Sequence, residues 1–334
     1  MMTPLFAQVD SDDTDLKLKL DLPLFDLPYQ IDAMNTVGHG FFSSYANPGM
    51  SQSLALTKDI YSAMHFGMKR LNDSLTIAPM WKYAIYYGGT VAGLLVFAYV
   101  LPFGYPWMQQ EYTRSILTRF GVNSFNGAYN YNTVNGMLTG VTDKSLEYFK
   151  NEAPHDFIRM YEANIEGYLL LSDSMLCNSF VYNLKDLSNW TALVSTFLTV
   201  SKISAPIAAE YGLADVDGDI KKMYENDGGQ ESRALASDYF INWGYELFHP
   251  HEPYAARGVH PSGDGIARYI TLSQLTEDEK HYLIKQGFLG YLNLLSPMLY
   301  GFRTFSLGHS GFEGNFALHH FLLLLVRIHR LKYS

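Results

Sequence analysis

The chain has one cysteine among its 334 residues and few charged residues for its length. Because Cys177 has no second thiol to pair with, an intramolecular disulfide and a cysteine metal cluster are both excluded. Charged residues make up 17% of the chain, against about 25% in ordinary soluble domains. The net charge of −9 and the lack of a basic stripe argue against a nucleic-acid partner.

The longest segment without a formal charge lies between Lys82 and Glu111. Its first part, residues 83–101, is almost wholly apolar, and as a helix it would be about 28 Å long, close to the thickness of a bilayer's hydrocarbon core. Aromatic residues crowd both ends of this part, as they do at membrane interfaces. The segment predicts a transmembrane helix, with the lipid bilayer as a partner and a membrane as the location. The alternative is a helix buried in a large soluble core.

Two glycines of this segment, Gly89 and Gly93, have the spacing that lets membrane helices approach closely, so a helix–helix partner is predicted there. Pro102 and Pro106 are expected to stop or kink the helix.

Helical spacing of apolar residues predominates in the rest of the chain and predicts a mainly α fold, with several apolar helices packed near the membrane helix. The predicted helical stretches are residues 54–75, 147–202 with breaks, 234–248, 276–302 and a last helix over 316–326. Residues 16–22 alternate between apolar and polar, which predicts a short strand or an extended arm. We predict three regions: an arm and loop over 1–53, a membrane-associated helical region over 54–210, and a second helical region over 211–334. The boundary before the third region falls in a polar, turn-rich segment, residues 215–229.

A polar segment, residues 107–115, follows the charge-free segment directly. In a zincin helix the pattern is H-E-x-x-H, because two histidines at i and i+4 share one face and the glutamate activates water. Here the same frame has Gln109 and Thr113 in place of the histidines and Gln110 in place of the glutamate. Together with Gly-Val-Asn-Ser at 121–124, the segment resembles bacterial membrane proteins of the zincin type, whose corresponding stretch reads roughly W-x-H-E-E-x-H-R.

This resemblance implies a membrane peptidase of the bacterial cell envelope whose zinc motif is degenerate. Neutral amides and a hydroxyl are poor zinc ligands, so the implied activity would be lost. Glu111 is the carboxylate that remains in the segment and is a candidate catalytic residue. The alternative is a polar helix start at a membrane surface, with Arg114 exposed.

A second candidate site is the helix that contains His155, Arg159, Glu162 and Glu166, which share one face by their spacing. Such a face could supply a carboxylate ligand, and the two glutamates could act as acid and base. The alternative is a solvated face held together by neighbouring opposite charges.

The third candidate is the histidine-rich loop, residues 249–265. His249, His251 and His260, with Glu252 and Asp264, could bind zinc. The alternative is an ordinary exposed loop. His319 and His320 are expected on the last helix, where adjacent side chains point about 100° apart and cannot easily share a metal.

Two functions follow from these candidates. In the first the chain is a non-catalytic membrane protein, a degenerate relative of zincin-type membrane peptidases. In the second it is an active zinc-dependent hydrolase whose metal is held by His249, His251 and His260 with Glu162 or Glu166.

Overall fold

The structure is a computed structural model that describes residues 18, 20–21, 48–99, 103–126, 138–181, 188–225, 233–235, 239–300, 302, 305–306, 312–321 and 323–333. At residues 97–99, 179–181 and 188–189, and beyond residue 302, it describes the backbone alone. The described chain is mainly helical, which confirms the predicted fold class in its coarse form. The strand or arm predicted at 16–22 lies outside the described residues, apart from three residues without regular structure.

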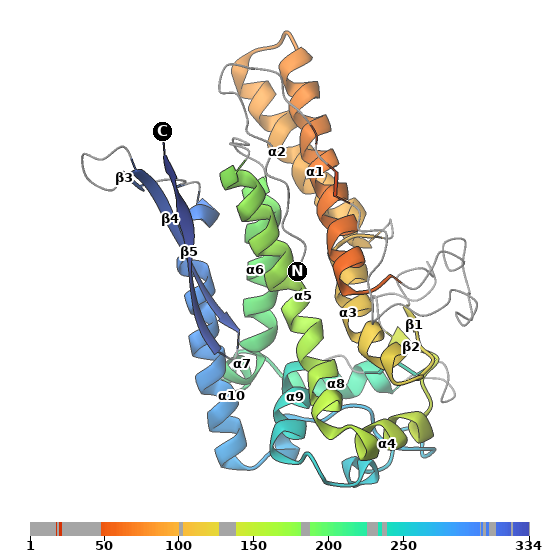
Figure 1. The fold of residues 1–334 in the computed structure, drawn as a ribbon. Helices are drawn as coiled ribbons and strands as arrows, with labels where there is room; N and C mark the ends of the chain where they lie inside the picture. The colour runs from red at the N-terminus through yellow and green to blue at the C-terminus, as the bar shows by residue number, and fades with distance from the viewer. Residues whose placement is uncertain are drawn as a thin grey trace.

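The described α-helices are α1 (Met50–Ser74), α2 (Pro79–Tyr99), α3 (Tyr105–Arg119), α4 (Asp143–Glu152), α5 (Pro154–Val181), α6 (Ser188–Ile203), α7 (Ala205–Glu210), α8 (Val216–Tyr224), α9 (Tyr239–Phe248) and α10 (Glu277–Gly290) (Figure 1). Short 3-10 helices are η3 (Tyr254–Arg257), η4 (Leu272–Gln274), η5 (Tyr291–Leu295) and η6 (Pro297–Tyr300). The strands are β1 (Phe125–Asn126), β2 (Leu138–Thr139), β3 (Phe305–Ser306), β4 (Phe312–Phe321) and β5 (Leu323–Tyr333). β1 pairs with β2, and β4 pairs with β3 and β5, all antiparallel.

Helix α5 is the centre of the bundle, because α3, α6 and α9 all pack against it. Its buried Phe157, Met160 and Leu171 belong to one continuous hydrophobic core that reaches all three neighbours. Burial of such side chains contributes about 1.5–3 kcal/mol each to folding. The core therefore fixes how α3 and α9 face α5, which is where the polar residues described below meet.

Local signals in the sequence set where several helices begin. Thr142 caps α4 by accepting a hydrogen bond from the Ser145 N–H at 3.2 Å. Thr276 and Glu279 form a capping box at the start of α10. Pro106 lies in the first turn of α3, where a missing N–H costs nothing. As the prolines predicted, α2 ends at Tyr99 and a new helix begins at Tyr105.

Helices α1 and α2 form a hairpin that projects beyond the ends of α5 and α6 (Figure 1). Gly89 and Gly93 of α2 face Met68 and Met64 of α1, so the glycine pair makes a close helix contact within this chain. Among the described residues, no helix has both the length and the apolar character that crossing a bilayer requires. The transmembrane helix predicted at 83–101 is not confirmed, and its last two residues lie outside the description.

The predicted last helix at 316–326 is wrong. This part of the chain forms β4 and β5, with Phe316 opposite Ile328 and Leu318 opposite Val326. A short apolar run has no periodicity that separates a strand from a buried helix, which explains the error. His319 and His320 therefore lie on a strand, where successive side chains point to opposite faces.

The segment predicted to be turn-rich, residues 215–229, contains helix α8 instead. Asp215 caps this helix by accepting a hydrogen bond from the Gly218 N–H at 3.0 Å. The sequence here is polar because α8 has one buried side and one solvated side, not because it is a turn. Elements on both sides of the predicted boundary pack together, since α9 contacts α5 and α10 contacts α6 and α7.

Candidate functional site

Helix α3, which carries the frame compared above with the zincin motif, runs through the interior of the bundle between α1 and α5. Gln109, Gln110 and Thr113 are buried, with at most 5% of each residue exposed. Arg114 is buried as well, so the alternative of an exposed arginine on a membrane surface is wrong. Its guanidinium donates to the Pro48 carbonyl at 3.2 Å and pairs with Glu111, and these partners hold it inside the protein.

Gln109 and Thr113 lie on the same face of α3 and both meet α5. The Gln109 side-chain amide donates to Asn164 Oδ1, and its Oε1 accepts from the Tyr168 hydroxyl at 2.5 Å. The Thr113 hydroxyl donates to the Met160 carbonyl at 3.3 Å. Both residues at the zinc-ligand spacing are thus bonded to neutral groups on the neighbouring helix.

Gln110 faces a different helix. Its Oε1 accepts from the Tyr239 hydroxyl on α9 at 2.9 Å, and burial raises the pKa of that phenol well above its ordinary value. The Lys202 ammonium lies 5.6 Å from the ring centre of Tyr168 and 5.8 Å from that of Tyr239. A cation over the faces of two tyrosines is favourable, and more so where water is partly excluded. We call Gln109, Gln110, Thr113, Asn164, Tyr168 and Tyr239 the α3 polar centre.

Glu111, the predicted catalytic carboxylate of this segment, is fully buried. Its Oε2 accepts from Arg114 Nε at 2.6 Å, and its Oε1 accepts from the Asn126 amide at 2.8 Å. Asn126 also donates to the Trp107 carbonyl at 3.0 Å, which fixes the amide in place. One carboxylate oxygen is therefore paired within α3, and the other fastens α3 to strand β1.

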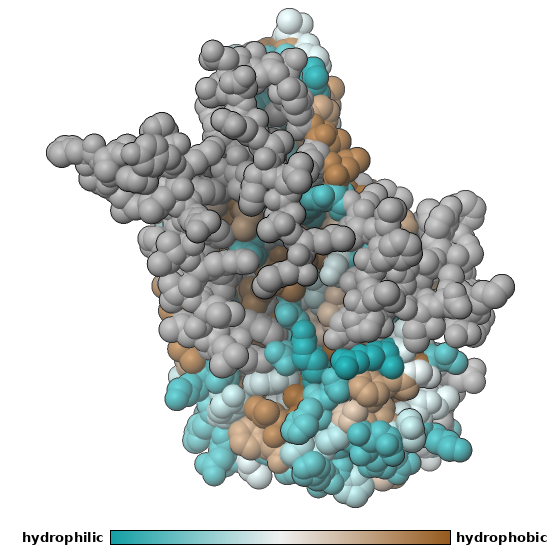
Figure 2. Space-filling model, viewed as in Figure 1, coloured by the Kyte–Doolittle hydropathy of each residue, from teal (hydrophilic) through white to brown (hydrophobic). Residues whose placement is uncertain are grey.

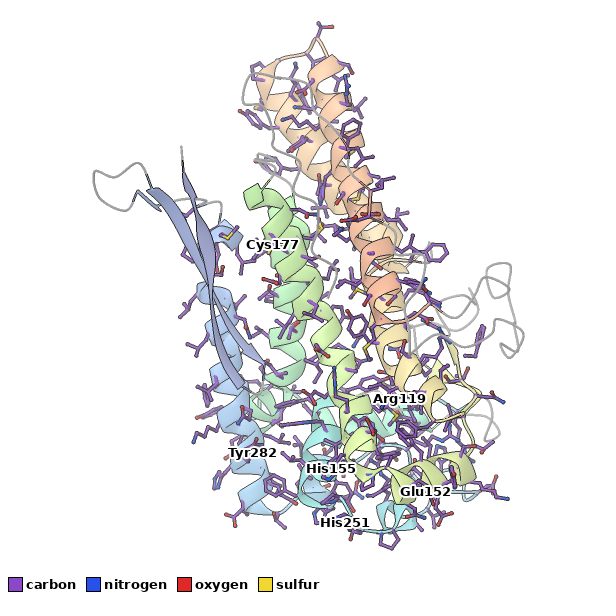
Figure 3. All side chains as sticks on the ribbon, viewed as in Figure 1. Arg119, Glu152, His155, Cys177, His251 and Tyr282 are labelled. Carbon is purple, nitrogen blue, oxygen red and sulfur yellow. The ribbon has the colours of Figure 1, made fainter. Side chains whose placement is uncertain are left out.

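The carboxylates predicted on α5 are partly buried and lie beside an arginine. Arg159 pairs with Glu166, two turns along the helix. Burial raises the pKa of Glu162, the nearby Arg159 opposes this rise, and the charge of Glu166 adds to it. The expected coupling between the two glutamates is present, but it is smaller than the effect of burial. His155 lies at the start of the same helix, at the lower end of the molecule in Figure 3.

The three histidines of the 249–265 loop have different surroundings. His249 Nε2 lies 2.7 Å from Glu279 Oε1 and its Nδ1 lies 3.5 Å from Glu252 Oε2. His251 is exposed at the lower end of the molecule (Figure 3). His260 is buried, with its Nδ1 2.9 Å from Ser262 Oγ. Burial is the main cause that lowers the pKa of His260, and neighbouring arginines lower it further.

In the part of the chain that the structure describes, no group of three or more His, Cys, Asp or Glu side chains is arranged to hold a metal ion. The pair formed by His249 and Glu279 is the contact that sequence reasoning missed in this region. The sequence does locate Glu279, because Thr276-x-x-Glu279 is a capping-box sequence that places this glutamate at the start of α10.

A buried ionic cluster around Glu246 was also missed. Glu246 Oε2 lies 2.6 Å from Lys150 Nζ, and its Oε1 accepts from Arg257 at 2.6 and 3.1 Å. Arg257 also donates to Asn242 Oδ1 at 2.8 Å and to the Tyr161 hydroxyl at 3.1 Å. One carboxylate thus serves two buried cations and ties α4, α9 and η3 together. Its partners are far apart in sequence, so no local pattern announces them.

The α5 members of the α3 polar centre had a sequence signal that sequence reasoning did not use. Met160, Asn164 and Tyr168 are spaced four residues apart, so they line one face of α5. A polar pair on an otherwise apolar helical face predicts partners across the helix interface. Comparisons with protein-family models, curated proteins and solved structures found no match to this chain.

Proposed function

We propose that this chain is a non-catalytic membrane protein, a relative of zincin-type membrane peptidases whose metal centre has become a neutral hydrogen-bond network. The observation that carries the proposal is the α3 polar centre. At each position where the resemblance calls for a ligand or a base, a neutral side chain is buried and bonded to another neutral group.

The chemistry of the frame opposes zinc binding. Zinc in proteins is held by imidazole, thiolate or carboxylate, whereas the frame offers two amides and a hydroxyl. The amide oxygens of Gln109 and Gln110 already accept hydrogen bonds from Tyr168 and Tyr239. An amide at position 110 also has no basic lone pair for taking a proton from water, so general-base catalysis is lost with the metal.

Helix α5, which packs against α3, also lacks a zinc ligand at the matching position. Catalytic zinc sites of the thermolysin type combine two histidines of one helix with a glutamate of another. Here Asn164 of α5 faces Gln109 directly, where such a third ligand would have to lie. Its carboxamide is neutral, so the three positions together carry no charge that could attract a cation.

The membrane part of the proposal rests on α2. One side of this helix is covered by α1, while Tyr83, Tyr87, Val91 and Leu95, at four-residue spacing, are exposed. An apolar, charge-free face of this kind is costly in water and favourable in a lipid environment. We therefore propose a location at a membrane of the cell envelope, with the exposed side of α2 from Tyr83 to Leu95 in contact with lipid.

The proposal is tested by metal analysis of purified full-length protein and by rebuilding the site. The wild type should contain no stoichiometric zinc. A variant with Gln109→His, Gln110→Glu, Thr113→His and Asn164→Glu should bind zinc, with a thermal midpoint that rises as zinc is added. The matched control keeps Asn164 and has only the three α3 substitutions, so it lacks the third ligand and should bind zinc more weakly.

The zinc content of the wild type tests the lack of catalysis, and zinc binding by the rebuilt variant tests the zincin relationship. Zinc in the wild type, lost on His249→Ala with His251→Ala, would contradict it and support the hydrolase built on the histidine-rich loop. A rebuilt variant that folds but binds no zinc would leave the protein non-catalytic and contradict the zincin relationship.

A further inference from the structure

The tip of the α1–α2 hairpin, which we define as residues 69–83, is the outermost part of the helical body (Figure 1). It comprises the last turns of α1, the connection, and the first turn of α2. Within it, Leu71, Ile77, Met80, Trp81 and Tyr83 are exposed, with Met80 at 71% and Trp81 at 59%. Figure 2 shows apolar surface along one edge of the projecting hairpin, below its outermost end. Large apolar side chains gathered at an exposed end mark an interaction site.

The same tip is positively charged although the chain as a whole has a net charge of −9. Lys69, Arg70 and Lys82 lie in it with Asp73 as the single acid, and no Asp or Glu follows before Glu111. The Arg70 guanidinium lies 5.6 Å from the centre of the Phe66 ring, which supports it near the end of α1. The partner that fits such a tip must accept apolar side chains and present negative charge beside them.

We propose that this tip docks on a lipid surface that contains anionic phospholipid. Met80, Trp81 and Tyr83 enter the boundary between headgroups and acyl chains, and the three cations contact lipid phosphates. Tryptophan and tyrosine favour this boundary because they join an apolar ring to a polar group. The proposal rests on the membrane location proposed above, and it adds the contact region and the class of lipid.

Lipid fits the tip better than a nucleic acid or an acidic protein. Cations alone would suit any polyanion, but Met80 and Trp81 would remain exposed on one. The exposed side of α2 continues from the tip through Tyr87, Val91 and Leu95 without a charge, and a polyanion would leave these side chains exposed as well. The boundary between anionic headgroups and acyl chains accepts both the cations and the apolar side chains of the tip.

The experiment is flotation of purified full-length protein with vesicles of phosphatidylcholine alone or mixed with phosphatidylglycerol. We expect binding to the anionic vesicles and at least tenfold weaker binding after Met80→Ser with Trp81→Ala, since two large apolar contacts are removed. Arg70→Gln and Lys82→Gln should each weaken binding about fivefold. The controls are Leu213→Ser and Lys222→Gln, exposed residues near α7 and on α8, which should leave binding unchanged.

Circular dichroism shows whether each variant is folded, and cell fractionation of the same variants separates this inference from the proposed function. Tip variants that bind anionic vesicles as the wild type does would overturn the docking inference. If they also stay in the membrane fraction, the membrane location stands and only the contact region is wrong. Loss of a concentration-dependent dimer on Met80→Ser, without vesicle binding, would overturn the inference by showing that a second copy covers the tip. Absence of the wild type from both vesicles and the membrane fraction would overturn docking and location together, and leave the metal test unaffected.

Discussion

Replacing Glu246 by glutamine should be among the most damaging single substitutions in this chain. The side chain keeps its size, but its charge is lost between Lys150 and Arg257, each at most 2% exposed. Both cations lie 2.6 Å from a Glu246 oxygen, so each loses its direct counter-charge. Removing one partner of a buried ion pair typically costs about 3–5 kcal/mol. Since domains are stable by about 5–15 kcal/mol, Glu246→Gln should consume a large part of the free energy of unfolding.

The assay is equilibrium urea unfolding of the wild type, Glu246→Gln, Lys150→Met and the double variant. We expect the double variant to recover part of the loss, because removing Lys150 leaves one buried cation instead of two for the remaining amide. The control is Glu277→Gln at the exposed pair with Lys280, which should not change the midpoint measurably. A Glu246→Gln midpoint equal to that of the control would refute the reasoning, since it would mean that the two cations are solvated or paired otherwise.

Three further predictions concern other buried positions. Burial lowers the pKa of His65 from 6.5 to about 4, so the unfolded chain binds the proton first as the pH falls. The free energy of unfolding should therefore drop by about 3 kcal/mol between pH 6.5 and pH 4. In urea unfolding at several pH values, His65→Phe should lack this drop. A Cβ at Gly287 would lie 2.7 Å from the Ile203 carbonyl oxygen, so Gly287→Ala should cost about 1–3 kcal/mol, whereas Gly67→Ala, with open space around it, should stabilise α1 by about 0.5–1 kcal/mol. Tyr168→Phe removes the hydroxyl that satisfies the buried amide oxygen on α3 and should lower stability by about 1–3 kcal/mol.

Each of these has a clear contrary result. A His65→Phe variant with the same pH dependence as the wild type would assign the acid loss to carboxylates instead. Equal effects of alanine at the two glycines would contradict the close approach of α10 to α6. An unchanged free energy of unfolding in Tyr168→Phe would mean that the α3 polar centre is not the tight network described above.

The sequence predicted that the long helices α1, α2 and α5 exist, because each has apolar residues over many positions and a proline at or near its start. It failed at residues 316–326, where a short apolar run suits a strand as well as a helix. It also failed at residues 216–224, where the polar residues predict turns but form the solvated side of helix α8. The prediction that Arg114 is exposed was wrong because a charged side chain is expected in solvent unless it has a buried partner. That partner is Glu111, whose burial the sequence does not show.

The candidate site was also predicted only in part. The frame formed by Gln109, Gln110 and Thr113 was visible as spacing along one helix. The spacing of Asn164 and Tyr168 marks a polar face on α5, but it does not say which helix that face meets. Asn164 and Tyr239 meet α3 only through tertiary packing, so their pairing with Gln109 and Gln110 was not predicted. Separation in sequence is also why the Glu246 cluster escaped prediction, since Lys150 lies on a different helix.

The most direct test of the proposed function is the zinc content of the purified wild-type protein, measured by elemental analysis after expression with zinc in the medium. Buried amides and a hydroxyl at positions 109, 110 and 113 predict zinc far below one ion per chain. One zinc ion per chain, retained through dialysis and lost on substitution of residues in or around the α3 polar centre or the histidine-rich loop, would contradict it.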